Sequence, residues 1–339
     1  MNTQLDAVWH PKALFKTVTE NVGYPTPTTM IGLQDAELIN VVMLENWYSS
    51  ADWQSCALNY LIENEGYEVI FSHFHSVDLQ SHMIIRYLTD KGFNKLPSAD
   101  FIKFLEDVYI QTDEYIGQFL HLLDEGWTIF LVSDHSLLSS DYEVYGLGNC
   151  SGVNYRIMEE LGYTKVKRDE EGRELHEIDW AQTLAVANRG IHIYINLKGR
   201  DRYGIVKPAD KYELEERIIS DLYSYRHPQS GKRIIALALR NREAVILGLG
   251  GPECGDILYF MAEGYISDHG SGLPTSQGYG DTYLGPIFLA AGQGIQSGCR
   301  TERVIRQVDV APTIAYLGGV RVPRECEGAV IYQILADEF

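Results

Sequence analysis

The feature that most constrains the fold is a run of alternating strand and helix patterns between residues 68 and 133. Glu68–His75 (EVIFSHFH) is rich in β-branched and aromatic residues, which predicts a buried strand. Helices are expected over about 79–89 and over 99–125, where apolar residues recur at helical spacing. Trp127–Ser133 then predicts another strand. This order is typical of a parallel sheet whose strands are joined by crossover helices.

The pattern changes after this strand and returns near the end of the chain. Gly190–Leu197 alternates like a strand, and Lys211–Tyr225 has helical spacing. Pro286–Ala291 then predicts a strand, and Val308–Leu317 predicts a helix. We therefore expect all 339 residues to form a single α/β domain, with an accessory lobe inserted at about residues 155–253.

Composition and charge exclude several classes of protein. The chain has 45% hydrophobic and 22% charged residues, the usual mixture for a globular protein rather than a disordered one. Its net charge of −19 repels phosphate backbones, so we expect no general nucleic-acid binding. The longest apolar runs have only strand length, and no secretion signal opens the chain, so we expect no membrane association.

The five cysteines indicate neither a disulfide framework nor a zinc ribbon. They are scattered, odd in number, and form no C-x-x-C pair. We interpret them as incidental thiols in a reducing compartment, and we expect a cytoplasmic protein.

Two predicted strands end in residues that can bind a metal ion. The first is followed by Asp78 and, four residues later, His82, and a helix beginning near Asp78 would place both on one face. The second ends in Asp134 and His135. A third candidate, His269, lies among glycines that favour a loop. Carboxylates and imidazoles bind Zn²⁺ well, and open α/β sheets bind ligands beyond the carboxyl ends of their strands.

Each of these pieces alone has a simpler interpretation. An Asp and a His four residues apart on a helix more often make a surface hydrogen bond. A strand-end Asp-His pair more often caps a helix beside a satisfied histidine. The order of D-x-x-x-H, then a strand ending in D-H, then a loop H-G before another strand and a glycine turn is much more specific.

That ordered set resembles the alkaline phosphatase superfamily, and most closely its type I phosphodiesterase/nucleotide pyrophosphatase branch. The resemblance runs from about Tyr67 to the C-terminus and rests on FSHFHSVDLQSH, FLVSDHS, RGIHIYINLKGR, SDHGSGLPTSQGYG, GPIFLAAGQGIQSG and VDVAPTIAYLGGVRVPRECEGAV. It implies an alkaline-phosphatase-like α/β sandwich with a mostly parallel central sheet flanked by helices. It also implies a hydrolase of phosphodiester, phosphomonoester or nucleotide pyrophosphate bonds in small substrates.

The resemblance further implies two divalent metal ions, usually Zn²⁺, with Mn²⁺ as the other candidate. Asp78, His82 and His269 would hold one ion, and Asp134 and His135 would hold the other. Two such cations can clamp a phosphoryl group between its attacking and leaving oxygens and offset the charge that develops there. The acidic surface then matters less to the substrate than this local field.

The nucleophile of the family pattern is not found upstream of Asp78. That pattern begins with a strand ending in a metal-binding Asp, followed by Ser or Thr at a helix start. Two poor substitutes exist, Glu45 with Ser49 and Ser50, and the Pro-Thr cluster Thr26, Thr28 and Thr29. The run before Glu45, Asn40–Leu44, has the length of a strand. We expect the chain to start after the nucleophile segment, which would leave the second ion with two ligands.

Some neighbouring residues have two interpretations. His73 and His75 lie on one face of their predicted strand, and interior histidines with satisfied hydrogen bonds are the favoured interpretation. The other is that they orient Asp78. Lys198 and Arg200 either solvate a loop, which is favoured, or bind a substrate phosphate.

Two other functions compete with a phosphoester hydrolase. One is a catalytically inactive remnant that binds metal or serves as a partner subunit, an interpretation favoured by the missing nucleophile. The other is a related hydrolase or mutase, such as a sulfatase, a phosphonate hydrolase or a phosphosugar mutase. A sulfatase would need a modified Cys or Ser in an upstream C/S-x-P-x-R-like motif, which the sequence lacks.

Overall fold

The computed structural model describes residues 8–26, 36–85, 98–137, 143–144, 149–150, 153–188, 190–262, 265–266, 282–283 and 285–336. The chain divides into two compact units. Unit 1 comprises Met1–His135 and Pro286–Phe339, and unit 2 comprises Ser136–Gly285.

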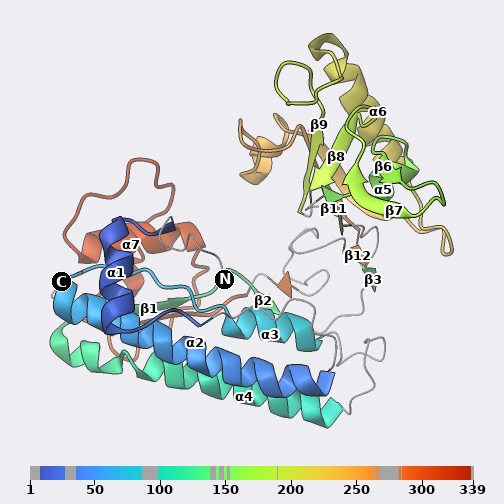
Figure 1. Ribbon diagram of the computed structural model, residues 1–339. Helices are drawn as coiled ribbons and strands as arrows, with labels where there is room; N and C mark the ends of the chain where they lie inside the picture. The colour runs from blue at the N-terminus through green and yellow to red at the C-terminus, as the bar shows by residue number, and fades with distance from the viewer. Residues whose placement is uncertain are drawn as a thin grey trace. The chain divides into compact units, whose positions relative to one another are not determined.

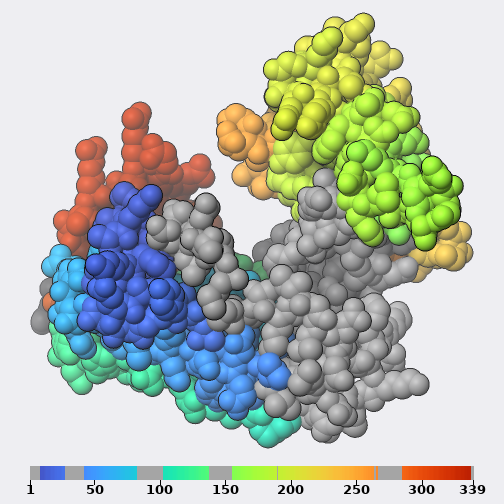
Figure 2. All heavy atoms as spheres, viewed as in Figure 1, coloured from blue at the N-terminus to red at the C-terminus, as the bar shows by residue number. Residues whose placement is uncertain are grey.

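Unit 1 is built mainly from helices (Figure 1). Their bounds are α1 Lys12–Asn21, α2 Ala36–Glu65, α3 Ser76–Ile85, α4 Ser98–Gly117 and α7 Val310–Leu317, with the 3-10 helices η2 Leu120–Glu125, η5 Gln307–Asp309 and η6 Tyr332–Ile334. The long helices α2 and α4 run side by side and share a core of buried side chains, Met43, Trp47, Phe104 and Val108. Helix α1 lies on the surface of the unit (Figure 2) and buries Val18.

The sheet of unit 1 consists, within the described residues, of two antiparallel strands. Strand β1 Thr128–Val132 pairs with β14 Phe288–Gly292, and Thr128 lies opposite Gly292. Gly292 has a φ of 116°, and a Cβ there would lie 2.1 Å from the carbonyl oxygen of Trp127. Only glycine fits this close approach of the two backbones, which lies at the end of the β1–β14 pair where the chain enters β1 from η2.

Unit 2 contains a six-stranded sheet in the order β10-β11-β9-β8-β5-β4. The strands are β4 Asn149–Cys150, β5 Val153–Asn154, β8 Ala185–Asn188, β9 His192–Ile195, β10 Ile235–Arg240 and β11 Ile257–Met261. Helix α6, Lys211–Ser224, packs on this sheet and shares its core through Leu214, Ile218 and Leu222. A burial period of four along α6 matches one helical face, and every residue of β11 is buried.

The other elements of unit 2 are short. They are α5 Arg156–Glu160, the hairpin β6 Val166–Arg168 and β7 Glu174–Ile178, the 3-10 helices η3 Pro208–Asp210 and η4 Ala244–Leu247, and the strands β2 Ser136–Leu137, β3 Glu143–Val144, β12 Tyr265–Ile266 and β13 Thr282–Tyr283. β2 pairs antiparallel with β13, and β3 pairs parallel with β12. No helix in the described part of the chain is both long and apolar enough to span a bilayer.

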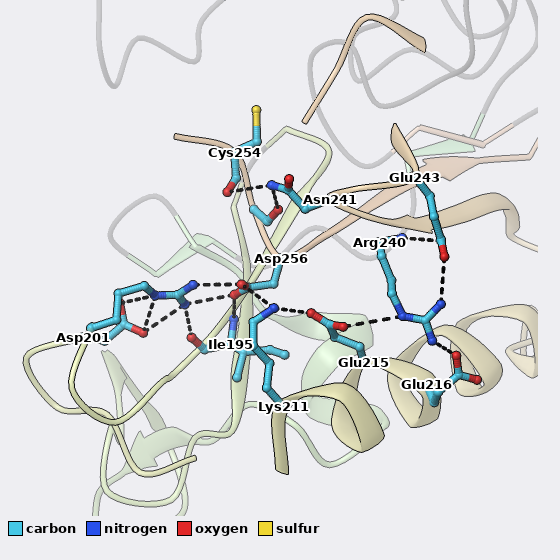
Figure 3. Close-up of polar contacts among 12 residues, drawn as sticks. Ile195, Asp201, Lys211, Glu215, Glu216, Arg240, Asn241, Glu243, Cys254 and Asp256 are labelled. Carbon is cyan, nitrogen blue, oxygen red and sulfur yellow. Dashed lines mark hydrogen bonds and ion pairs between the residues drawn. The ribbon is translucent and has the colours of Figure 1, made fainter. Parts of the chain in front are cut away.

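A buried charged network connects α6 to the sheet of unit 2 (Figure 3). Asp256 accepts hydrogen bonds from the backbone N of Ile195 at 2.7 Å and from the two terminal nitrogens of Arg200 at 2.8 and 2.9 Å. Lys211 Nζ lies 3.1 Å from the same carboxylate and also contacts Glu215. Burial raises the pKa of Asp256, but the hydrogen bonds and the two cations outweigh it, so this pKa lies below its ordinary value.

Most predicted elements are confirmed. The expected helices correspond to α3, to α4 followed by η2, to α6 and to α7, and the strands expected over 127–133, 190–197 and 286–291 correspond to β1, β9 and β14. Residues 86–89, at the end of one predicted helix, lie outside the described residues. The accessory lobe over about 155–253 stays a prediction.

The strand expected over Glu68–His75 is wrong. The segment has no regular secondary structure and pairs with no strand among the described residues, and Val69 and Phe71 are 61% and 79% exposed. Side-chain contacts take the place of a strand ladder, since Gln54 Nε2 donates to the carbonyl oxygen of His73 at 3.0 Å. A composition that favours strands therefore forms none here, because no strand in the described part of the chain supplies the hydrogen bonds.

The mostly parallel central sheet is also not seen. In the part of the chain that the structure describes, β1–β14 and all neighbours of the six-stranded sheet are antiparallel. β3–β12 is the one parallel pair of strands there, beside two isolated parallel bridges, Leu197–Val206 and Lys198–Asp201. Because Glu68–His75 forms no strand, the predicted crossover connection has no strand to join to β1. The run Asn40–Leu44 likewise lies inside α2, because Met43 and Trp47, one turn apart, bury the same helical face against α4.

Candidate active site

Asp78 lies in the first turn of helix α3. The helix begins at Ser76, directly after the segment Glu68–His75, and Leu79 N donates to the carbonyl oxygen of His75 at 3.1 Å. A carboxylate in the first turn is favoured by the partial positive charge of the helix N-terminus. His75 Nε2 lies 2.6 Å from Asp78 Oδ2, which fixes one oxygen of this carboxylate.

Asp134 and His135 form the turn that follows β1. Ser133 N still donates to the carbonyl oxygen of Ile287 at 3.3 Å and extends the pairing with the strand that leads into β14. Ser133 Oγ then donates to the carbonyl oxygen of His135 at 2.8 Å, and His135 N donates to Asp134 Oδ1 at 3.1 Å. Gln307 Nε2, at the start of η5, donates to the carbonyl oxygen of Ser133 at 3.0 Å. These bonds hold the loop at the end of β1 in one conformation.

The structure brings Asp78 and His135 together within unit 1. His135 Nε2 lies 3.5 Å from Asp78 Oδ1 and 3.8 Å from Asp134 Oδ2. The side chains of His135 and Asp78 are 18% and 24% exposed, whereas that of Asp134 is 78% exposed. Two predicted ligands from separate parts of the chain therefore meet at the end of β1, with Asp134 at the solvent side.

The two remaining predicted ligands are not placed by the structure. His82 lies in α3 one turn beyond Asp78, but its side chain is outside the described residues, and so is the whole of His269. Among the described side chains, no group of three or more His, Cys, Asp or Glu is arranged to hold a metal ion. The complete set of five ligands thus stays a prediction, and the structure shows only that the side chains of Asp78, Asp134 and His135 lie near one another.

The donors that do converge suit a divalent ion. A carboxylate and an imidazole supply hard oxygen and borderline nitrogen ligands, which is the chemistry that Zn²⁺ and Mn²⁺ accept. The contact of His75 with Asp78 resembles the outer contacts that orient ligating side chains at metal sites. The chemistry of these two side chains therefore suits such an ion, although the described residues do not by themselves form a complete ligand set.

His73 and His75 are not the interior histidines that the strand pattern favoured. Both are exposed, and their rings lie 4.9 Å apart. Because the segment before α3 is not a buried strand, these side chains remain near solvent, and His75 contacts Asp78 instead. The alternative interpretation, that one of them orients Asp78, describes the observed contact.

The Glu45 alternative for a strand-end ligand and its nucleophile is wrong. Glu45 lies within α2, far from a strand end, and Ser49 Oγ donates back to the carbonyl oxygen of Glu45 at 3.2 Å in the ordinary helical manner. Ser50 lies in the same helix and is buried. The Pro-Thr cluster falls largely outside the described residues, since Thr28 and Thr29 are not described.

Arg200 does not simply solvate a loop, as the favoured interpretation expected, because it pairs with the buried Asp256. Its guanidinium is paired with Asp256 and also contacts Asp201 at 3.0 Å. Two carboxylates already neutralise this guanidinium and occupy its hydrogen-bond donors, so it is poorly suited to bind a substrate phosphate.

Sequence reasoning missed the polar cluster behind Asp78. Ser76, Gln80 and Gln111 are fully buried and hydrogen-bonded to one another. The spacing of Ser76 and Gln80 at i and i+4 shows that they share a helical face, but nothing in the sequence marks Gln111, on α4, as their partner.

Comparison with known families gives a match over most of the chain. A family model described as type I phosphodiesterase/nucleotide pyrophosphatase matches residues 17–282, a span that contains all five predicted ligands. No match was found among curated proteins, and none among solved structures. The match covers both ligand segments that meet at the end of β1. The chain therefore belongs to the type I phosphodiesterase/nucleotide pyrophosphatase family.

Proposed function

We propose that this chain is a divalent-metal-dependent hydrolase of phosphodiester, phosphomonoester or nucleotide pyrophosphate bonds, with two ions, Zn²⁺ or Mn²⁺, at the end of β1. The family supports hydrolysis of phosphoesters at the coarse level. The observation that carries the metal site is the approach of His135 Nε2 to within 3.5 Å of Asp78 Oδ1. These residues are predicted to hold different ions, and two ions about 3.5–4 Å apart draw their ligands from one small region of the protein.

Asp78, His82 and His269 would hold one ion, and Asp134 and His135 would hold the other. When bound, the ions supply Lewis-acid polarisation of the phosphoryl oxygens. The chain's own groups prepare that site. His75 holds Asp78 Oδ2, so that Oδ1 faces His135. The turn after β1 fixes His135 through Ser133, and the exposed Asp134 leaves the site open to solvent and substrate.

Acid-rich surroundings do not oppose this chemistry. The chain has 47 acidic and 28 basic residues, so a free phosphate ester is repelled at long range. Salt screens that repulsion beyond about 10 Å at 0.1 M ionic strength, whereas bound cations act at contact distance. Turnover is therefore expected to depend on metal and to rise modestly with salt.

The test combines metal analysis with hydrolysis. The full chain is stripped with a chelator, reloaded with Zn²⁺ or Mn²⁺, and assayed with bis(p-nitrophenyl) phosphate, p-nitrophenyl phosphate and a p-nitrophenyl nucleotide ester. We expect two ions per chain by elemental analysis and metal-dependent release of nitrophenol. Asp78→Asn and Asp134→Asn should each lose bound metal and reduce hydrolysis by more than about 100-fold, because each removes a direct ligand.

Asp113→Asn is the matched control, since Asp113 is an exposed carboxylate on α4. It should bind two ions and keep full activity. Unchanged metal content in both ligand variants would refute the proposal. Two bound ions without hydrolysis of any ester would instead support the inactive metal-binding alternative.

A further inference from the structure

The amide of Gln111 connects three helices of unit 1. Ser76 Oγ donates to Gln111 Oε1 at 2.6 Å, and Gln80 Nε2 donates to the same oxygen at 3.3 Å. Gln111 Nε2 donates to the carbonyl oxygen of Leu44 at 2.9 Å. One side chain of α4 thus contacts the first two turns of α3 and the third turn of α2.

All three interacting side chains are completely buried. Ser76, Gln80 and Gln111 are each 0% exposed, and Gln80 Nε2 also donates to Ser76 Oγ at 2.7 Å. The Oε1 atom of Gln80 has no hydrogen-bond partner among the described residues, but Ser76 Oγ, Gln80 Nε2 and both ends of the Gln111 amide do. A rotation of α3 would leave these buried polar atoms without partners, which is costly. The apolar contacts of α3, through Val77 and Leu79, are not directional and would tolerate a small rotation of the helix.

The hydrogen bonds act on the face of α3 opposite to Asp78. Successive residues of an α-helix are turned by about 100°, so Ser76 and Gln80 share one face and Asp78, midway between them, lies on the other. Holding the first face against Gln111 therefore sets the direction of Asp78. A rotation of α3 by one residue would carry this carboxylate away from His135, which lies 3.5 Å from Asp78 Oδ1.

We infer that Gln111 is a positioning residue for the metal site, which sets the rotation of α3 and so the approach of Asp78 to His135. The inference rests on the proposed function. Gln111 touches neither ligand, and its effect passes through Ser76 and Gln80.

The test measures Co²⁺ binding to the chelator-stripped full chain, using the visible absorption of Co²⁺ as a report on its ligands. Gln111→Leu removes the acceptor for Ser76 and Gln80. We expect about 10–100-fold weaker Co²⁺ affinity and an altered spectrum, the effect typical of losing a contact behind a metal ligand. Gln111→Glu keeps an acceptor for both side chains and should retain more affinity than Gln111→Leu.

Tyr115→Phe is the matched control. Tyr115 lies one turn farther along α4, is 8% exposed, and its hydroxyl contacts Ser72 Oγ at 3.0 Å without touching α3. A purely structural role for Gln111 predicts that affinity follows stability, with the buried charge of Gln111→Glu the most damaging change. Positioning predicts the reverse order for the two Gln111 variants and wild-type Co²⁺ binding by Tyr115→Phe.

The outcomes separate this inference from the proposed function. If the wild-type chain binds no Co²⁺, both are overturned. If it binds Co²⁺ and Gln111→Leu binds as tightly as Tyr115→Phe, the metal site stands and the positioning role of Gln111 is overturned.

Discussion

Replacing Asp256 with Asn tests whether the buried charged network holds unit 2 together. The Asp256 side chain is 7% exposed and is the shared partner of Ile195 N, Arg200 and Lys211 (Figure 3). Asn retains an acceptor oxygen for Ile195 N but removes the negative charge. Arg200 and Lys211 would then face each other across a neutral amide.

The expected loss of stability depends on how well Arg200 and Lys211 can be stabilised by their other partners and by water. Removing one partner of a buried ion pair costs about 3–5 kcal/mol. Here Arg200 and Lys211 are 41% and 31% exposed, and they keep Asp201 and Glu215 as second partners. Water and these carboxylates offset part of the loss, so we expect Asp256→Asn to lower the free energy of unfolding by about 2–3 kcal/mol.

The assay is urea unfolding with amide hydrogen exchange read on peptides that span β9 and β11. The midpoint should fall with little change in slope, and the lost protection should be confined to unit 2. Glu243→Gln is the control, because Glu243 is 39% exposed and pairs with Arg240 in an extension of the same network. It should cost less than about 1 kcal/mol. Equal losses in the two variants would show that burial of Asp256 adds nothing, and the reasoning would fail.

Two further predictions concern pH and a glycine. Because hydrogen bonds and cations hold the pKa of Asp256 below its ordinary value of 3.8, its stabilisation is complete above that pH and is lost as pH falls through the folded-state pKa. Urea midpoints of the wild type should therefore drop below about pH 4 more steeply than those of Asp256→Asn, and parallel profiles would contradict this. Gly292→Ala should cost more than about 2 kcal/mol, since its Cβ would lie 2.1 Å from Trp127 O, whereas Gly298→Ala, with open space around it, should cost about 1 kcal/mol in thermal unfolding.

Several helices and the order of the candidate ligands were predictable because both depend on local properties of the chain. Apolar spacing indicated α4 and α6, and the positions of Asp78, Asp134 and His135 after predicted elements indicated a metal site. Two of the five predicted ligands fall where the structure does not describe the side chain. For the others, Asp78 and His135 lie close together, and their role as metal ligands stays a prediction.

Strand pairing was the point at which sequence reasoning failed. Glu68–His75 and Trp127–Ser133 both have compositions that favour strands, yet only the second forms one, opposite β14. A strand is stable when another segment supplies its hydrogen bonds, and that segment can lie anywhere in the chain. The same dependence explains why His73 and His75 are exposed rather than interior.

The amino-acid sequence by itself determined helices α3, α4, α6 and α7, the absence of C-x-x-C metal motifs and the order of the candidate ligands, because each depends on neighbours within a few residues. Only the tertiary structure decided that β1 pairs antiparallel with β14, that Gln111 contacts the start of α3, and that Asp256 joins Arg200 to Lys211. These contacts join residues that are distant in sequence. The partner of a buried hydrogen-bonding or charged group is set by which distant segments the fold brings together, and no local sequence pattern identifies that partner.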